Sequence, residues 1–183
     1  MTRIIIRAMP ERADMVDTLL ADLPDALICY DQQRDAMDTF LRALALAGDE
    51  PAVHMEEDVR LASNFRDRLE AAIAERPEHV IQFFSMRKAD LTTGSRWDSN
   101  YLMLQCTYLP AEYSALIRAY APVWPARKEH PTGCDTLIRD WLKARRERYW
   151  IHVPSLVDHL PVKSLIDPRR STKRQSLTFE QPE

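Results

Sequence analysis

Three consecutive carboxylates, Glu56-Glu57-Asp58, follow a short apolar run at residues 51–55. Adjacent acids repel one another, and they are tolerated cheaply on a solvated helix face, whereas at the end of a buried strand they need a counter-charge. Hard divalent cations take carboxylate oxygens as ligands, so one interpretation is a metal site at the carboxyl end of a strand. The other interpretation is a solvated acidic turn that opens the next helix.

Alternating apolar runs and segments of helical period must position these acids. The apolar runs predict strands at 4–6, 26–30, 53–55, 80–84, 101–108 and 149–153. The helical-period segments predict helices at 15–23, 37–46, 61–76, 111–120 and 136–148. The polar segment 86–99 is expected to be a loop, and 121–132, with its three prolines, to be irregular. This alternation favours an α/β fold, with a mostly parallel central sheet flanked by helices.

Two groups of acids fall at the predicted ends of strands. Asp31 follows the second predicted strand, and the triplet Glu56-Glu57-Asp58 follows the third. In open α/β sheets, ligands bind outside the carboxyl ends of the strands. This placement supports the metal interpretation of the triplet.

The length of 183 residues suits one domain with a real core, and the hydrophobic content of 45% and charged content of 29% are those of a soluble globular protein. We find no apolar stretch of membrane-spanning length and no signal peptide, so we expect a cytoplasmic protein with no membrane association. Three cysteines, Cys29, Cys106 and Cys134, lack the spacing of a metal site, and we expect Cys29 and Cys106 to be buried within strands.

Charge is distributed unevenly along the chain. Thirteen acidic and three basic residues lie between positions 11 and 58, whereas ten basic and four acidic residues lie between 139 and 174. A basic C-terminal third suits a polyanion such as DNA, or the phosphates of a nucleotide. The alternative is a basic helix face followed by a disordered tail. Three aromatic residues, Trp97, Tyr101 and Trp124, either stack on a flipped-out base or a sugar, or belong to the core.

The acidic triplet resembles the DxD-type motif of GT-A fold glycosyltransferases, and three further segments resemble that family in its order. These are Q-C-T-Y-L-P at 105–110, G-C-D-T-L-I at 133–138 and V-P-S-L-V-D-H at 153–159. The S-L-I of 164–166 and a basic stretch follow, as in the family. The resemblance covers about residues 3–170 and is strongest to small bacteriophage-encoded members, some of which glycosylate hydroxymethylated bases in DNA. It implies a single GT-A-like, Rossmann-like domain at 1–168 and a basic C-terminal tail at 169–183, which is either a lid or disordered.

The function that this resemblance implies is metal-dependent transfer of a sugar from a nucleotide-sugar donor, a UDP-sugar by preference, to a hydroxyl acceptor. The acceptor that it favours is 5-hydroxymethylcytosine in phage DNA, which would place the enzyme in the host cytoplasm. A glycan or protein acceptor is the first alternative. A metal-dependent phosphodiesterase and a non-catalytic nucleotide-binding or DNA-binding protein are further alternatives.

The resemblance also implies a metal site for Mn²⁺ or Mg²⁺. Asp58 is then the direct ligand, Glu57 acts through water or the ribose, Glu56 supports them, and the late His159 joins the metal shell. Imidazole combined with carboxylate suits Mn²⁺. Glu57 stands where the family usually has Asp, so its direct ligation depends on the longer side chain. The alternative for His159 is a surface histidine in a loop.

Two acids are candidate general bases. If the reaction inverts the anomeric centre, a carboxylate must take the proton of the acceptor hydroxyl. Asp135, at a predicted helix start, matches the family position, and its alternative role is to cap that helix. Asp98, in the loop before the fifth predicted strand, is the weaker candidate.

Donor contacts are expected after the first two strands. Ala8, Arg12 and Asp31 stand where the family binds the nucleobase, and Arg34 and Arg42 could reach base or phosphate. The basic residues expected to close over the diphosphate are Lys163, Arg169 and Arg170. Each charged residue has the alternative of a solvated surface charge, or of a place in a disordered basic tail.

Overall fold

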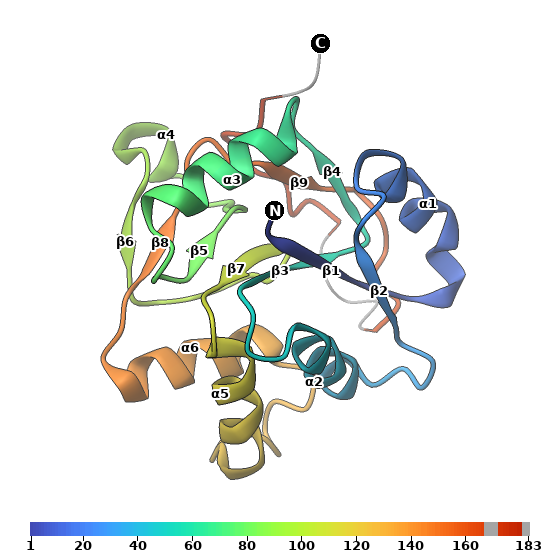
Figure 1. The fold of residues 1–183 in the computed structure, drawn as a ribbon, viewed down its shortest axis with the longest axis vertical. Coiled ribbons are helices and arrows are strands. Elements are labelled where there is room, and N and C mark those ends of the chain that lie inside the picture. The colour runs from blue at the N-terminus through green and yellow to red at the C-terminus, as the bar shows by residue number, and fades with distance from the viewer. Residues whose placement is uncertain (167–171, 181–183) are drawn as a thin grey trace.

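The computed structural model describes residues 1–166 and 172–180 and is built on a seven-stranded sheet (Figure 1). Across the sheet the order is β2 (Leu27–Tyr30), β1 (Arg3–Ala8), β3 (Ala52–Glu56), β7 (Cys106–Leu109), β5 (Ile81–Gln82), β8 (Tyr149–Ile151) and β6 (Arg96–Asp98). The strand pairings make five strands parallel to one another, with β7 and β6 running the opposite way. The predicted α/β fold with a mostly parallel central sheet is confirmed.

Helices cover both faces of this sheet. On one face, α1 (Ala13–Asp22), α3 (Phe65–Glu75) and a small antiparallel pair, β4 (Val59–Leu61) with β9 (Val157–His159), share a hydrophobic cluster with the central strands. On the other face, a second cluster joins α2 (Ala36–Ala47), α5 (Tyr113–Tyr120) and α6 (Cys134–Arg145). Short helical turns occur at η1 (Pro10–Arg12), α4 (Asp90–Thr93) and η2 (Ala121–Val123).

The central strands are buried because their sequences are apolar on both faces. Ile4, Ile5 and Ile6 of β1 are all fully buried between the two helical layers. Cys29 in β2 and Cys106 in β7 are also buried, as predicted. Asp35 caps the start of helix α2, because its carboxylate accepts the Asp38 backbone N–H at 2.9 Å. Gly48, where φ is +63°, caps the end of this helix.

Several predicted elements differ from the structure. The segment 86–99, predicted to be a loop, contains α4 and the edge strand β6. The segment 101–108, predicted to be a strand, joins the sheet only from Cys106 onward. The sequence did not predict the strand pair β4–β9, because strands of three residues are too short to show an alternation of apolar and polar residues. None of the helices in the described part of the chain is both long and apolar enough to cross a membrane.

Residues 172–180 do not extend away from the domain. The backbone N–H of Ser176 donates to Asp158 Oδ1 at 2.6 Å, and its hydroxyl donates to Ser155 Oγ at 2.9 Å. The Ser155 backbone N–H in turn donates to Thr178 Oγ1 at 3.2 Å. The described part of the predicted basic tail is therefore docked against β9 and the loop that precedes it.

Candidate active site at the carboxyl ends of β1, β2 and β3

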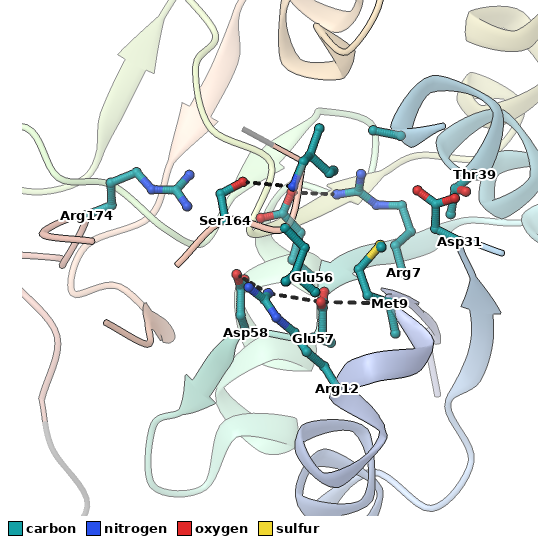
Figure 2. A pocket seen from close by; sticks show the side chains of 14 residues that line it. Arg7, Met9, Arg12, Asp31, Thr39, Glu56, Glu57, Asp58, Ser164 and Arg174 are labelled. Atoms are coloured by element: carbon teal, nitrogen blue, oxygen red, sulfur yellow. Dashed lines mark hydrogen bonds and ion pairs between the residues drawn. The ribbon is translucent and has the colours of Figure 1, made fainter. Parts of the chain in front are cut away.

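A small cavity lies where β1, β2 and β3 end, as Figure 2 shows. Its volume is about 80 Å³. Side chains from β1, η1, the end of β2, the start of α2, the acidic triplet and the segment 164–166 form its walls. The fold therefore places Asp31 and the triplet at one site, as the sequence predicts for the ends of neighbouring parallel strands.

Backbone hydrogen bonds set the positions of these acids. The Glu57 N–H donates to the Arg7 carbonyl at 3.1 Å, which continues the β1–β3 pairing past the end of β3. The Asp31 N–H likewise donates to the Ala8 carbonyl at 2.8 Å. On the same edge, Pro10 starts the single turn η1, which ends at Arg12.

Glu57 and Asp58 are buried and share one guanidinium group. Arg12 Nη1 lies 3.0 Å from Glu57 Oε1 and 2.7 Å from Asp58 Oδ2. Each of the two acidic residues is only 6% exposed. The alternative of a solvated acidic turn is therefore wrong for this pair.

His159 lies against the acid pair, although it is far from it in the sequence. The antiparallel pairing of β4 with β9 places His159 opposite Val59. Its Nε2 is 3.4 Å from Asp58 Oδ2 and 2.8 Å from Arg174 Nη2, and its side chain is fully buried. The alternative of a surface histidine is wrong, and His159 lies beside Asp58 in the fold.

Burial and charge affect the two acids differently. Burial and the adjacent Asp58 raise the pKa of Glu57 to about 7, against the opposing effect of Arg12. Burial also disfavours the charged form of Asp58, but hydrogen bonding to His159 and the charge of Arg12 outweigh it and hold the pKa of Asp58 below its ordinary value. The pair is therefore only partly neutralised by Arg12.

Glu56 faces another way from its two neighbours. Its Oε1 pairs with Arg7 Nη2 at 3.2 Å, and its Oε2 accepts from Gln105 Nε2 at 3.0 Å. The Arg7 guanidinium also lies over the Phe40 ring, 5.3 Å from the ring centre. Glu56 therefore pairs with Arg7 and Gln105 in the wall of the site, whereas Glu57 and Asp58 pair with Arg12.

Asp31 presents one oxygen that has no partner in the described part of the chain. Its Oδ1 accepts the backbone N–H groups of Gln33 at 3.2 Å and Asp35 at 3.0 Å, and the residue is 4% exposed. Within the described residues, Asp31 Oδ2 is buried and has no hydrogen-bond partner. Because an unpaired buried carboxylate oxygen is costly, this atom is suited to accept an N–H or O–H group from a ligand.

A second, larger cavity of about 370 Å³ adjoins the first. The two share the walls made by Arg7, Ala36, Glu56, Ile166 and Arg174. Asp135, at the start of α6, lines the second cavity. Its Oδ1 accepts the Thr136 N–H at 2.9 Å and its Oδ2 accepts the Met103 N–H at 3.4 Å, so it ties the helix start to the cavity wall.

Other predicted site residues are not brought to these cavities. Asp98 lies in edge strand β6, where it pairs with Arg87, and it lines neither cavity, which corrects its assignment as a candidate base. Arg34 is exposed and pairs with Glu11 on the surface, which corrects its donor role. Arg42 likewise pairs with Asp38 along α2. Arg169 and Arg170 lie outside the described residues.

Of the remaining donor residues, Ala8 and Arg12 line the first cavity as expected. Lys163 reaches the site through its backbone, because its carbonyl accepts from Arg12 Nη2 at 2.6 Å.

The aromatic residues that were candidates for base stacking belong to the core or to other contacts. Tyr101 is fully buried against Tyr149, and Trp124 is buried and donates to Asp140 Oδ2 at 3.0 Å. Trp97 packs edge-on against Trp150 in the β6–β8 strands. The interpretation that Tyr101 and Trp124 stack on a flipped-out base is wrong.

Sequence reasoning missed part of the site. The lining residues that were given no role in the site include Arg7, Gln105, Arg174 and the segment 164–166. One signal for Arg7 was present, since it is the only charged residue that follows the buried isoleucines before β1 ends. A charge at the carboxyl end of a buried strand needs a partner, and Glu56 supplies it.

The residue types at the acid pair fit a divalent cation. Among the described residues, no group of three or more His, Cys, Asp and Glu side chains is arranged to hold a metal directly, and Arg12 lies on the acid pair instead. However, Asp58 Oδ1 is buried with no hydrogen-bond partner among those residues, and His159 Nε2 is adjacent. Carboxylate combined with imidazole is a donor set that suits Mn²⁺, and carboxylate oxygens also suit Mg²⁺.

Comparison with solved structures gives distant likenesses. No protein-family model and no curated protein matches the chain. Among solved structures, apo UDP-glucose pyrophosphorylase is similar at 10% identity and a TM-score of 0.43, over 82% of this chain and 72% of that one. A glycosyltransferase involved in glycosylation of the major capsid of PBCV-1 is similar at 8% identity and a TM-score of 0.35, over 83% of this chain and 94% of that one. Likeness at this level carries no argument about activity.

Proposed function

We propose that the protein is a metal-dependent glycosyltransferase that moves a sugar from a nucleotide-sugar, preferably a UDP-sugar, to a hydroxyl acceptor. The observation that carries the proposal is the meeting of Asp31, the buried pair Glu57–Asp58 and His159 at the carboxyl ends of three neighbouring parallel strands. Two of these acids present a buried oxygen that has no hydrogen-bond partner within the described residues. One such oxygen suits a ligand donor group and the other suits a cation.

Charge balance supports a requirement for metal. Four carboxylates and three guanidinium groups line the first cavity, so a diphosphate would add negative charge to walls that already carry an excess of acids. Glu57 and Asp58 share the single guanidinium group of Arg12, so Arg12 supplies one positive charge to two acids. When bound, Mn²⁺ or Mg²⁺ would supply Lewis-acid stabilisation of the charge on the departing diphosphate. Asp58, Glu57 and His159 would hold it.

Asp31 supports the preference for a nucleobase with an N–H donor. The backbone N–H groups of Gln33 and Asp35 fix its carboxylate through Oδ1, and Asp31 lines the cavity together with Ala8 and Thr39. Uracil presents one N–H between two carbonyl groups, which matches a single free acceptor oxygen. Asp31 would thus bind the base, and Ala8 would leave room for it at the end of β1.

The second cavity is the proposed acceptor site. Asp135 lines it and shares the common wall with the donor cavity through Glu56 and Arg7. In an inverting reaction, the acceptor oxygen forms a bond to the anomeric carbon while the sugar–phosphate bond breaks with its electron pair going to the diphosphate. Asp135 would take the proton of the acceptor hydroxyl.

The acceptor that we propose is 5-hydroxymethylcytosine in phage DNA. The basic balance of the C-terminal third supports it, together with the sequence resemblance to phage-encoded glycosyltransferases. Because phosphate contacts release counterions, DNA binding should weaken steeply as the salt concentration rises. A glycan or protein acceptor would show little dependence on salt.

Release of UDP from a panel of UDP-sugars tests the function. With Mn²⁺ and duplex DNA containing 5-hydroxymethylcytosine, we expect UDP release that unmodified DNA does not support. The variant Asp135→Asn should lower the rate by about 100-fold or more, since a positioned general base contributes about 10²–10⁴-fold. The control Asp17→Asn changes an exposed acid of α1 and should leave the rate unchanged.

Other results would point elsewhere. UDP release only with glycan or protein acceptors would replace DNA as the acceptor. Metal-dependent cleavage of nucleic acid without any sugar donor would indicate a phosphodiesterase. Binding of UDP-sugars with no turnover on any acceptor would indicate a non-catalytic nucleotide-binding protein.

A further inference from the structure

Arg12 connects two parts of the site that are distant in the sequence. Its Nη1 contacts Glu57 Oε1 and Asp58 Oδ2, while its Nη2 donates to the Lys163 carbonyl at 2.6 Å. The Arg12 residue is 8% exposed, so these contacts are made largely out of water. One guanidinium therefore joins the acid pair to the chain segment that leads into the cavity wall at 164–166.

Arg12 occupies the position where a cation would be most strongly attracted. Arg12 contacts Glu57 Oε1 and Asp58 Oδ2, and a divalent cation bridging Glu57 and Asp58 would bind the same two carboxylates. A guanidinium and a divalent cation on the same carboxylates repel each other strongly in a buried site, because the effective dielectric constant there is low. Binding of a metal to both acids therefore opposes the retention of Arg12 on both.

The size of the cavity makes movement of one wall necessary. Cavities that take drug-sized ligands measure about 300–1,000 Å³, whereas this one measures about 80 Å³. Apart from the segment 164–166, its walls come from β1, η1, β3 and α2, from the residues directly after β1, β2 and β3, and from Arg174. The segment 164–166 belongs to no helix or strand, and Arg12 holds the residue that precedes it. We call this segment the roof.

We propose that Arg12 is the resident counter-cation of Glu57 and Asp58, and that a divalent cation arriving at these acids displaces Arg12 and thereby releases the roof. The inference rests on the proposed function in one respect, namely that the acids take a divalent cation. It assigns Arg12 a positioning role: the side chain keeps the acid pair neutralised and the donor cavity closed until metal binds. The displaced guanidinium is then available to the diphosphate.

Mn²⁺ binding without nucleotide tests this proposal. We expect Arg12→Met to bind Mn²⁺ at least tenfold more tightly than the wild type, as measured by electron paramagnetic resonance of free Mn²⁺. The control Arg118→Met removes an exposed arginine of α5 and should leave the affinity unchanged. Arg12→Lys keeps the charge without a guanidinium fork and should give an intermediate affinity.

Hydrogen exchange tests the release of the roof. Amides of 164–166 should exchange faster in Arg12→Met than in the wild type, and faster in the wild type when Mn²⁺ is present. If Arg12→Met folds only with Mn²⁺, that rescue is itself the expected result, since the metal then replaces the missing charge. Unchanged Mn²⁺ affinity in both Arg12 variants, or unchanged exchange of the roof, overturns the proposal.

The two proposals fail separately. Tighter Mn²⁺ binding in Arg12→Met, with no nucleotide-sugar bound by any variant, would support the role of Arg12 and remove the glycosyltransferase assignment. Mn²⁺-dependent binding of a UDP-sugar by the wild type, with no change of Mn²⁺ affinity in Arg12→Met, would do the reverse.

Discussion

Glu57 and Asp58 are adjacent in sequence and equally buried, yet their protonation differs because their partners differ. Asp58 has both His159 and Arg12 beside it, which keeps its pKa low. Glu57 has Arg12 on one side and the charge of Asp58 on the other, so its pKa rises to about 7. At this scale the acid pair shares one guanidinium group between two carboxylates, which is the reason for proposing a cation there.

His54 provides a test of burial that is independent of the site. It lies in β3, fully buried, with Nε2 3.3 Å from Ser114 Oγ, and burial lowers its pKa to about 3. Because the unfolded chain binds this proton near the ordinary pKa of 6.5 and the folded chain does not, stability is full above pH 6.5 and falls as the pH drops toward 3.

We predict that wild-type protein loses about 2 kcal/mol more free energy of unfolding between pH 7 and pH 5 than His54→Gln does, since Gln does not titrate. Urea unfolding at the two pH values measures this difference. The comparison cancels contributions from other groups, including Glu57, whose raised pKa acts in the opposite direction. Equal losses in the two proteins would contradict a lowered pKa of His54 in the folded chain.

At the scale of elements, β4 and β9 decide whether His159 reaches Asp58. These three-residue strands lie on the face of the sheet that also carries α1 and α3, and Leu156, just before β9, is fully buried in their shared cluster. The sequence supported His159 only through the family resemblance, because neither strand is long enough to show a pattern. The pairing of residues about a hundred positions apart is a tertiary result.

We expect Leu156→Ala to lower the free energy of unfolding by about 2–5 kcal/mol, as for other fully buried leucines. The same change should weaken Mn²⁺ binding, since β9 positions His159. Chemical unfolding and a Mn²⁺ titration at a temperature where the variant is folded measure the two effects. The control Leu116→Ala truncates a leucine that is 38% exposed. If Leu156→Ala binds Mn²⁺ like the wild type, β9 does not position a ligand.

At the scale of the whole molecule, the alternation of the longer strands and helices was predictable, whereas the direction of β7 was not. Apolar runs flanked by helical patterns located β1, β2, β3 and the helices around them, and those three strands are the ones that bring Asp31 to the acid triplet. The sequence of an apolar strand does not indicate its direction in the sheet, so the antiparallel orientation of β7 could not be predicted. Arg12 was expected near the donor, but its contact with the triplet depends on η1, whose single turn has no periodicity.

The measurement closest to the central claim is thermal unfolding of the protein with UDP-sugars, with and without Mn²⁺. The account predicts a stabilising shift that requires both UDP-sugar and Mn²⁺, because the metal supplies the positive charge that the acid-rich donor cavity lacks. Asp58→Asn should abolish the shift, and Asp17→Asn should retain it. A shift of equal size without Mn²⁺, or one that persists in Asp58→Asn, would contradict the account.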